Sequence, residues 1–287
     1  MNKLVVITLI KNEASYILEF VDYYTKIGVD KIYIYDDEST DNVKNILTPY
    51  KNVIYNKIIR RNKNDQTKFI NRWGHYEHFK KNYADECDWV LCVDCDEFLT
   101  FTSKTNLSIK NMLESYDKLN IHSILINFNN FLPIKNENIN SSSIMQFTKS
   151  IKIEKDTYDL NYKSLVKVKY IDFDLITNNH CIPIITDKYY SSNCKEIKYI
   201  NKTLLIPHKN EFKLFFIKTN DQFLKLNHYK FRNWKNKINN YKFNTWNKYY
   251  NNKTLKNMLN NKNYKIDNFL KELYIKNKNN KNFDFNL

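Results

Sequence analysis

Short apolar runs alternate with helical patterns through the first hundred residues of this 287-residue chain. Apolar runs of four to eight residues predict buried strands, whereas apolar residues spaced three and four apart predict amphipathic helices. The predicted strands are residues 4–10, 31–35, 53–59 and 89–93, and the helices between them are residues 14–27, 43–47 and 73–84. This alternation predicts an α/β fold with a mainly parallel sheet and helices on both faces.

Carboxylates follow two of the predicted strands. Asp36 and Asp37 come at the end of the second strand, and Asp94 and Asp96 follow the fourth. Because the carboxyl ends of parallel strands meet at one edge of a sheet, where α/β proteins bind ligands, we expect both pairs in one site. Adjacent carboxylates repel each other unless a cation or a proton lies between them, and a divalent ion bridging to a diphosphate would remove that repulsion. The alternative is that this short Asp-x-Asp motif is a solvated turn.

Glycine is nearly absent, since the chain contains only Gly28 and Gly74. A P-loop and a Rossmann G-x-G-x-x-G motif both need several glycines, so both are excluded. A nucleotide would therefore be held by side chains and a metal ion. Gly28 is predicted to end the first helix. Later in the chain, the pattern predicts a helix over residues 109–116 and strands over residues 123–128, 143–147 and 165–170.

Lysine and arginine are concentrated near the C-terminus. Residues 225–287 hold 15 of them against three acidic residues, and so supply 12 of the net charge of +15. Their aromatic residues have helical spacing, which is typical of a packed helix. We therefore predict an α/β domain over residues 1–220 and a basic helical extension over residues 221–287 that packs on it. The extension would contact an anionic ligand, a partner or a membrane surface, and the codon bias of an AT-rich genome would also explain its charge.

The sequence also constrains the compartment. No apolar run approaches the ~18 residues of a membrane span, and residues 4–10 are too short for a signal peptide and lack a cleavage site. The five cysteines are odd in number, dispersed and without a C-x-x-C pair, which is typical of reduced thiols. These features predict a cytoplasmic protein with no transmembrane segment.

Several motifs occur in a familiar order. They are Lys11-Asn12-Glu13, Ile34 to Asp41, Gln66, Asp94 to Leu99, Lys163-Ser164-Leu165-Val166 and His228-Tyr229. In this order they resemble the GT-A glycosyltransferases, in particular the family-2-like and family-92-like branch, over roughly residues 3–240. The resemblance implies a Rossmann-like, mainly parallel sheet flanked by helices. It also implies transfer of a sugar, in a hexosyltransferase-type reaction of glycan biosynthesis, from a nucleotide sugar, with a uridine diphosphate (UDP) sugar expected, to a glycan, protein or small-molecule acceptor.

The same resemblance implies a metal site for Mn²⁺ or Mg²⁺. Asp96 would bind the ion directly, Asp94 would reach the ion or the ribose, and His228 would complete the ligand set. An imidazole ligand favours Mn²⁺ over Mg²⁺, since harder ions prefer oxygen. The alternative for His228 is a surface histidine at the start of a helix.

The resemblance further implies contacts with the nucleotide. Asn12 and Glu13 would lie under the base or ribose, and Asp36 or Asp37 would accept a hydrogen bond from the base. Gln66 would face the diphosphate or the base, as would Arg60, Arg61 and Arg72. Turn and cap chemistry also explains residues 37–41, and we assign Ser39 and Asp41 to that structural role.

The branch is inverting, so one carboxylate should act as a general base. The candidates are Glu97, Asp187 and Glu211, while His180 and His208 would contact the acceptor. Three other functions remain open. One is nucleic-acid binding by the basic aromatic C-terminal segment, which the helical spacing of the aromatic residues disfavours. The others are a metal-dependent phosphoesterase, which usually needs a second metal cluster, and an inactive sugar-binding module.

Overall fold

The computed structural model describes most of the chain up to residue 230 and a short C-terminal segment. The described residues are 2–58, 74–138, 141–151, 158–159, 162–176, 180–197, 199–200, 214–215, 217–218, 222–230, 232 and 264–276. All structural statements below concern these residues.

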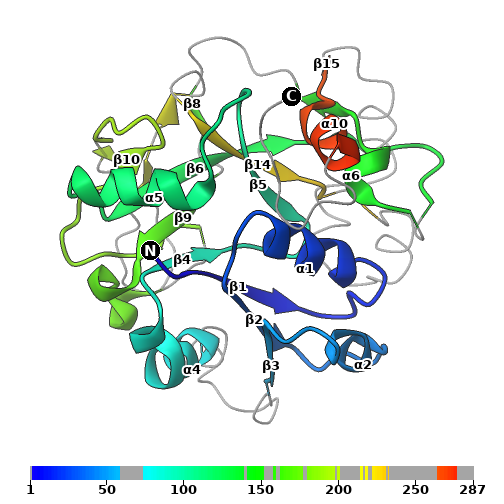
Figure 1. Cartoon of the computed structure of the whole chain (residues 1–287), viewed down its shortest axis with the longest axis horizontal. Coiled ribbons are helices and arrows are strands. Elements are labelled where there is room, and N and C mark those ends of the chain that lie inside the picture. Colours follow the sequence, from blue (N-terminus) through cyan, green and yellow to red (C-terminus); the bar gives the residue numbers. More distant parts are fainter. Residues whose placement is uncertain are drawn as a thin grey trace.

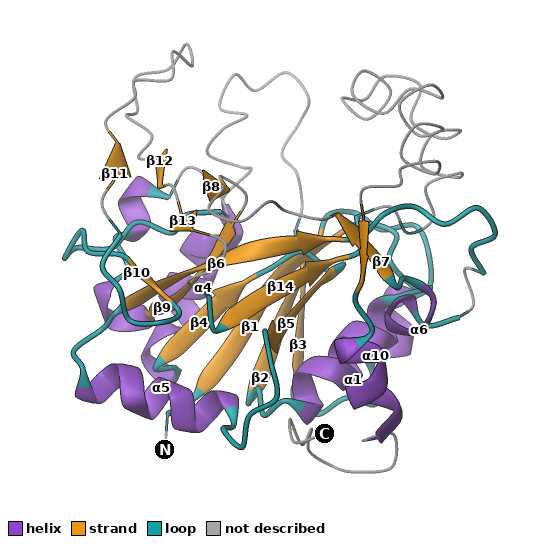
Figure 2. Ribbon diagram, turned by 90° about the horizontal axis from the view of Figure 1, so that it is seen from above, coloured by secondary structure: helices purple, strands orange, loops and turns teal. Residues whose placement is uncertain are grey.

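The centre of the fold is one sheet of nine strands (Figures 1 and 2). In spatial order its path comprises β3 (Val53–Lys57), β2 (Lys31–Asp36), β1 (Leu4–Ile10), β4 (Trp89–Cys92), β9 (Tyr162–Lys167), β6 (Ser123–Asn130), β14 (Leu224–His228) and β5 (Glu97–Phe101). A short ninth strand, β10 (Tyr190–Ser191), pairs with β6. The first four strands are parallel, and β9 and β5 run antiparallel to their neighbours. The predicted α/β fold with a mainly parallel sheet is confirmed.

Helices and short strands surround this sheet. The helices are α1 (Ile17–Lys26), α2 (Val43–Leu47), α4 (Gly74–Tyr83), α5 (Ile109–Lys118), α6 (Ser143–Gln146) and α10 (Phe269–Lys276), with 3₁₀ turns at Ala84–Glu86, Val168–Tyr170 and Phe173–Leu175. The short strands are β7 (Lys149–Ile151), β8 (Tyr158–Asp159), β11 (Tyr199–Ile200), β12 (Leu214–Phe215), β13 (Ile217–Lys218) and β15 (Tyr264–Ile266).

Both faces of the sheet are covered by apolar side chains. Along β1, Leu4 and Val6 belong to the core packed by α1, α5 and α10, whereas Val5 and Ile7 belong to the core packed by α4. This alternation follows from the two-residue period of a strand. It fixes the register of the sheet, because a shift of one residue would exchange the two faces.

The end of α1 shows how the scarce glycine is used. Gly28 has a φ of +95°, and the Val29 amide donates to the Tyr24 carbonyl at 3.0 Å. This is a Schellman motif, in which glycine takes the left-handed position. The predicted helix end at Gly28 is confirmed.

Three sequence predictions differ from the structure. The strand predicted over residues 165–170 is β9 (Tyr162–Lys167), and Val168–Tyr170 is a 3₁₀ turn. Residues 143–147 were predicted as a strand, but Ser143–Gln146 is helix α6. The Glu19 carboxylate accepts from the Ser143 and Ile144 amides at 2.9 and 3.1 Å, and Ser142 Oγ caps the same turn. The Ser142 cap is a local signal for a helix start, but the contacts from Glu19 come from α1 and have no signal in the local sequence.

The pattern from residue 221 was predicted as helical, yet Leu224–His228 is a strand inside the main sheet. Helix α10 (Phe269–Lys276) lies within the extension that was predicted as helical, and most of the basic segment lies outside the described residues. The domain boundary at residue 220 stays a prediction. In the part of the chain that the structure describes, no helix has the length and hydropathy that a membrane span requires.

Candidate functional site

The carboxyl ends of the parallel strands form the edge of the sheet that carries the acidic motifs. Ile10 pairs with Asp36 across β1 and β2, and Ile7 pairs with Cys92 across β1 and β4. Asp94 follows Cys92 by two residues, so both acidic pairs lie at the same edge. The prediction that the strand order brings them to one edge is confirmed.

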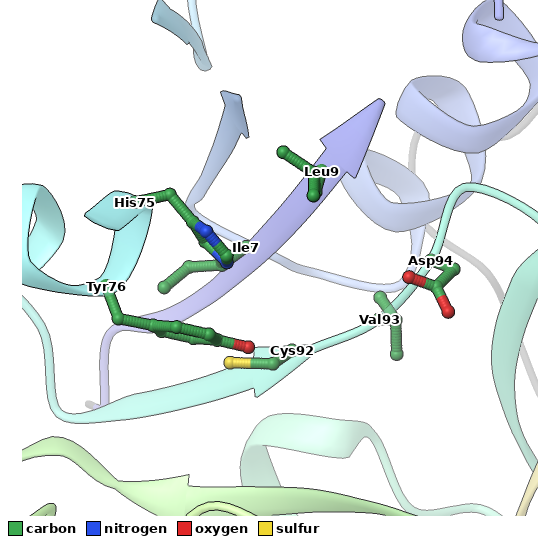
Figure 3. A pocket seen from close by; sticks show the side chains of 7 residues that line it. All are labelled: Ile7, Leu9, His75, Tyr76, Cys92, Val93 and Asp94. Atoms are coloured by element: carbon green, nitrogen blue, oxygen red, sulfur yellow. The ribbon is translucent and has the colours of Figure 1, made fainter. Parts of the chain in front are cut away.

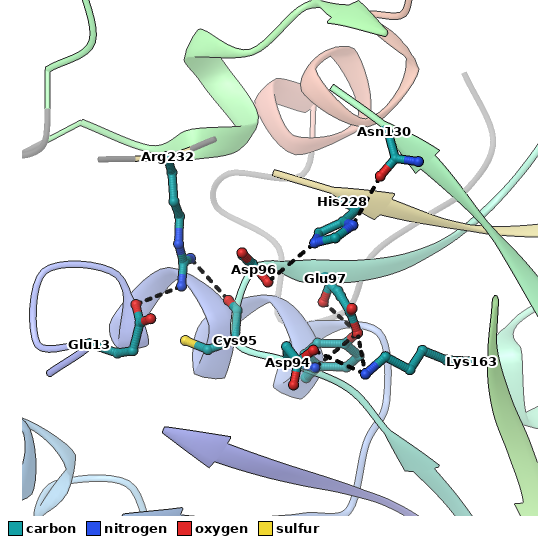
Figure 4. Close-up of polar contacts among 10 residues, drawn as sticks. Glu13, Asp94, Cys95, Asp96, Glu97, Asn130, Lys163, His228 and Arg232 are labelled. Atoms are coloured by element: carbon teal, nitrogen blue, oxygen red, sulfur yellow. Dashed lines mark hydrogen bonds and ion pairs between the residues drawn. The ribbon is translucent and has the colours of Figure 1, made fainter. Parts of the chain in front are cut away.

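The chain reverses direction at the Asp-x-Asp motif, and strand pairing then brings distant residues together (Figure 4). Residues 93–96 connect β4 to the antiparallel β5, which begins at Glu97. His228, the last residue of β14, pairs with Glu97 on one side and with Asn130 of β6 on the other. The register of three strands therefore places His228 beside the motif.

Asp96, Glu97 and His228 each offer one ligand atom, and these atoms lie within 4.8 Å of one another. His228 Nε2 is 3.8 Å from Asp96 Oδ1. Two atoms that each lie about 2.1 Å from one ion are about 3.0–3.8 Å apart for angles of about 90–130° at the ion. The Asp96–His228 pair therefore fits a single bound cation.

The protonation state of His228 also suits a metal ligand. His228 Nδ1 lies 3.0 Å from Asn130 Oδ1, an acceptor, so Nδ1 carries the proton and Nε2 has the lone pair. Burial lowers the pKa of His228 to about 4, although the Asp96 and Asp94 carboxylates act to raise it. The imidazole is therefore neutral at physiological pH, with Nε2 toward Asp96 (Figure 4).

Glu97 is buried, with a side chain that is 1% exposed. Its Oε2 accepts from the Asp94 amide at 2.9 Å and lies 3.5 Å from Lys163 Nζ. Burial raises the pKa of Glu97 well above its ordinary value, and Lys163 only partly offsets this effect. These contacts give Glu97 a structural role in the turn of the motif.

Lys163 of β9 is fully buried and faces the same carboxylates. Its Nζ donates to Asp94 Oδ2 at 3.0 Å. Burial acts to lower the pKa of Lys163, but the Asp94 and Glu97 carboxylates outweigh it and the pKa lies above its ordinary value. The Lys-Ser-Leu-Val stretch was recognised in the sequence, but no role was predicted for its lysine.

Arg232 is a second buried cation, which the sequence analysis did not select. Its Nη1 donates to the Cys95 carbonyl at 3.0 Å and its Nη2 to Glu13 Oε2 at 2.7 Å. The guanidinium also lies 4.4 Å from the centre of the Tyr16 ring. Arg232 thus joins the Asp-x-Asp loop to the loop after β1. The only available signal was its position four residues after His228.

The loops after β1 and β2 are hydrogen-bonded to each other. Asn12 donates its amide to Ser39 Oγ at 2.9 Å, and its side-chain oxygen accepts from the Thr40 amide at 2.7 Å. Asp41 Oδ2 accepts from the Ala14 amide at 2.8 Å. The structural roles predicted for Ser39 and Asp41 are confirmed. Asn12 belongs to the same network.

Asp36 and Asp37 have different surroundings. Asp36 accepts from the Ser39 amide at 2.8 Å and from the Tyr55 hydroxyl. Burial acts to raise the pKa of Asp36, but these hydrogen bonds lower it overall. Asp37 is buried at the rim, with Lys11 Nζ 3.9 Å from its carboxylate. One Asp36 carboxylate oxygen therefore serves the loop after β2, and the other is held by Tyr55 of β3.

A small pocket opens beside the motif, between the ends of β1 and β4 and the start of α4 (Figure 3). Its lining residues are Ile7, Leu9, His75, Tyr76, Cys92, Val93 and Asp94. The walls are mainly apolar and aromatic, and Asp94 contributes a carboxylate at one side.

Among the remaining predicted residues that the structure describes, Asp187 lies away from this edge. Asp187 lies in an exposed turn shortly before β10, which pairs with the start of β6 at Ile124. Asn130 is six residues further along β6, about 20 Å away at the rise of a strand. The structure therefore places Asp187 toward the opposite edge. Gln66 and Glu211 lie outside the described residues, as do Arg60, Arg61, Arg72 and His208.

His180, by contrast, lies near the site. Its Nδ1 is 3.1 Å from the Tyr162 carbonyl, next to Lys163 in β9. The centre of its ring lies 6.1 Å from the centre of the Phe128 ring, which in turn lies 4.7 Å from the centre of the His228 ring. Because a carbonyl only accepts, the proton is on Nδ1 and Nε2 has the lone pair. Burial and Lys163 lower the pKa of His180, so the ring is neutral at physiological pH.

Comparison with solved structures gives low similarity. The 4-diphosphocytidyl-2C-methyl-D-erythritol synthase of Anaerococcus prevotii is 14% identical, with 61% of this chain and 73% of that chain covered and a TM-score of 0.31. Glucosyl-3-phosphoglycerate synthase of Mycobacterium tuberculosis, solved with Mn²⁺ and UDP, is 17% identical, with 34% of each chain covered and a TM-score of 0.24. At these TM-scores neither similarity supports a conclusion about the function of this chain.

Comparison with protein families and curated sequences is decisive. The model of glycosyltransferase family 92 matches residues 6–274. A family 92 protein of Oryza sativa subsp. japonica is 28% identical over 116 residues, which are 39% of this chain and 18% of the relative. One of Ricinus communis is 23% identical over 203 residues, which are 70% of this chain and 35% of the relative. The chain thus spans well under half the length of these relatives. The family match extends over nearly all of the chain, and the chain belongs to glycosyltransferase family 92.

Proposed function

We propose that this chain is a divalent-metal-dependent glycosyltransferase that moves a hexose from a nucleoside diphosphate sugar to an acceptor hydroxyl with inversion. A UDP-sugar is the expected donor. One observation carries the proposal, namely the 3.8 Å separation of His228 Nε2 and Asp96 Oδ1 at the edge of the sheet where α/β proteins bind ligands. The neutral imidazole and the carboxylate supply a nitrogen and an oxygen ligand, a combination that favours Mn²⁺ over Mg²⁺.

Asp96 and His228 would hold the ion, and the bound ion would withdraw negative charge from the departing diphosphate. Asp94 lines the pocket between β1 and α4. Its carboxylate would accept hydrogen bonds from sugar or ribose hydroxyl groups. The carboxylate is 46% exposed and therefore accessible to a ligand.

The nucleotide base would lie over the loops after β1 and β2. Asp36 or Asp37 would accept a hydrogen bond from a base N–H, and Asp36 also accepts hydrogen bonds from the Ser39 amide and the Tyr55 hydroxyl. Asn12 and Glu13 would support the base or the ribose through the backbone that their side chains hold in place. Gln66 keeps its predicted role toward the diphosphate or the base.

Inversion requires a group that takes the proton of the acceptor hydroxyl. Among the predicted bases, Glu97 is buried, the strand register places Asp187 toward the opposite edge, and Glu211 lies outside the described residues. His180 is partly exposed, and its Nδ1 bonds the Tyr162 carbonyl, so the lone pair is on Nε2. We therefore add His180 to Glu97 and Glu211 as a candidate base. A loss of kcat in His180→Asn with an unchanged KM for the donor would support this role.

The central test is release of nucleoside diphosphate from a panel of nucleotide sugars, with and without Mn²⁺. We expect release from at least one donor, dependence on the metal, and a loss of about 100-fold or more in Asp96→Ala. Glu114→Gln on α5 is the matched control, since it removes an exposed carboxylate away from the site. Absence of release from every donor, or equal activity of Asp96→Ala, would refute the proposal.

The alternatives have less support. In the described residues only one set of three metal-capable side chains meets, whereas two-metal phosphoesterases need a second. The basic C-terminal segment, which nucleic acid or a membrane surface would contact, lies mostly outside the described residues. A cytoplasmic location stays a prediction.

A further inference from the structure

Lys163 is a buried cation for which the proposed chemistry has no use. Its side chain has 0% exposure, and it extends from β9 between Asp94 and Glu97 (Figure 4). Lysine is almost never fully buried unless it is paired. Its Nζ lies 3.0 Å from Asp94 Oδ2 and 3.5 Å from Glu97 Oε2. The two carboxylates therefore share one ammonium group.

Stability alone does not explain this lysine. Replacing a buried ion pair by apolar residues is often neutral or stabilising, so such a pair is weak support for a purely structural role. What an ammonium group does here, and an apolar side chain would not, is fix the direction of the Asp94 carboxylate. Asp94 is 46% exposed and follows the end of β4, and the buried ammonium group of Lys163 gives its carboxylate a fixed partner at 3.0 Å.

The direction imposed on Asp94 separates it from the metal-capable group. Asp96, Glu97 and His228 have ligand atoms within 4.8 Å of one another, and Asp94 is not a member of this group in the described structure. The two aspartates of the motif therefore differ in their surroundings. Asp96 faces His228 Nε2, whereas Asp94 faces Lys163 Nζ.

We propose that Lys163 is a positioning residue that holds the Asp94 carboxylate away from the metal ion, so that Asp96 and His228 bind the ion and Asp94 serves the sugar nucleotide. This inference rests on the proposed function, because it requires an ion at Asp96 and His228. The sequence left open whether Asp94 reaches the ion or the ribose, and this inference assigns Asp94 to the sugar nucleotide.

Removal of the Lys163 ammonium group should strengthen the binding of the metal ion. In Lys163→Met the Asp94 carboxylate loses its contact with the buried ammonium group that directs it away from the ion, and the site also loses one positive charge. Both changes favour a bound cation. Mn²⁺ should therefore bind more tightly to the variant than to the wild type. A lysine that only stabilised the fold would give weaker binding when removed.

The experiment measures the binding of Mn²⁺ alone, without nucleotide, from the paramagnetic resonance signal of the free ion. Asp94→Asn should change the dissociation constant by no more than about fivefold, as expected for the loss of a nearby charge, while Asp96→Asn should weaken binding by about 100-fold or more, as expected for the loss of a ligand. Lys163→Met should bind about tenfold or more tightly, and Lys163→Met with Asp94→Asn should lose that gain, which is the coupling that a double-mutant cycle measures.

The outcomes separate this inference from the proposed function. Equal losses in Asp94→Asn and Asp96→Asn would make Asp94 a ligand and overturn the inference, while the metal site would stand. Absence of Mn²⁺ binding by the wild type would overturn the metal site and the role of Lys163 together. Asp94 is half exposed, so Asp94→Asn should fold and decides the question even where Lys163→Met does not.

Discussion

The ion pair between Lys225 and Asp267 attaches the C-terminal segment to the sheet, and its removal should strongly destabilise the fold. Lys225 Nζ lies 2.7 Å from Asp267 Oδ2, and their side chains are 12% and 7% exposed. The same oxygen accepts from Asn129 Nδ2 at 3.0 Å. Asp267 directly follows β15, which pairs with β7, and precedes α10, whose Leu270 and Leu273 lie in the main core.

The expected cost of Asp267→Ala follows from these contacts. Breaking a buried pair typically costs about 3–5 kcal/mol, because it leaves the other charge without a partner. Lys225 would escape part of this cost by losing its proton, which requires about 4.6 kcal/mol at pH 7 from an ordinary lysine pKa of about 10.4. The two estimates agree, so we expect Asp267→Ala to lower the free energy of unfolding by about 3–5 kcal/mol. The free energy of unfolding of a native protein is typically about 5–15 kcal/mol.

The assay is equilibrium unfolding in urea, followed by tryptophan fluorescence, for the wild type, Asp267→Ala and the double variant Lys225→Met/Asp267→Leu. The apolar pair should recover most of the loss and lie within about 2 kcal/mol of the wild type. Burial already lowers the pKa of Lys225, although Asp267 acts to raise it. Without Asp267 the folded pKa falls further, so the unfolded chain binds the proton that the folded chain lacks.

The pH dependence of the stability follows from this difference in bound protons. Stability rises with pH wherever the unfolded state binds more protons, so the deficit of Asp267→Ala should shrink as pH rises from 7 toward the ordinary lysine pKa. The slope is at most about 1.4 kcal/mol per pH unit. A deficit below about 1 kcal/mol at pH 7, or a double variant as unstable as Asp267→Ala, would refute the reasoning.

Three further predictions concern other parts of the structure. Arg232→Met should lower the free energy of unfolding by about 2–4 kcal/mol, since it removes charged hydrogen bonds to Cys95 and Glu13. Thermal unfolding measures this loss. The control is Lys118→Met, which removes an exposed cation. In metal-free buffer the folded protein should lose about 2–4 kcal/mol between pH 6.5 and 4 through His228, because its folded pKa of about 4 lies below the unfolded value and the unfolded chain takes the proton first. Urea unfolding across this range should show a shallower loss in His228→Asn, and an identical pH profile would count against the assignment. Glu19→Gln should cost about 1–3 kcal/mol by weakening the hydrogen bonds to the amides that begin α6, and an unchanged urea midpoint would contradict that role.

The sequence predicted the edge of the sheet well because the relevant signals were local. Each strand that carries a carboxylate has its own apolar run, and the α/β alternation dictates which ends meet. The position of β14 was not predictable in this way. Leu224–His228 is short, lies in a basic stretch and becomes a strand by pairing with β5 and β6, which are about 100 or more residues away along the chain.

The partners of the site residues depended on the same long-range pairing. Asn130, which sets the tautomer of His228, follows from the register between β6 and β14. Lys163 was visible only as a lysine in an apolar strand. The helix at Ser143–Gln146 depends on Glu19, whose carboxylate comes from α1. In each case the contact that determines the local structure joins segments that are far apart in the sequence, and periodicity within one segment does not reveal it.

The Asp-x-Asp motif owes its geometry to these distant contacts more than to its own sequence. The loop reverses the chain without a glycine, and its members are held by different elements. Lys163 of β9 pairs with Asp94, Arg232 donates to the Cys95 carbonyl, and the Tyr229 amide donates to the Asp96 carbonyl at 2.9 Å. Contacts on both sides of the loop fix its backbone, so the Asp96 side chain can face His228 before any ligand binds. Such preorganisation lowers the cost of ordering the site on binding, and it explains why a two-carboxylate motif becomes specific only within this fold.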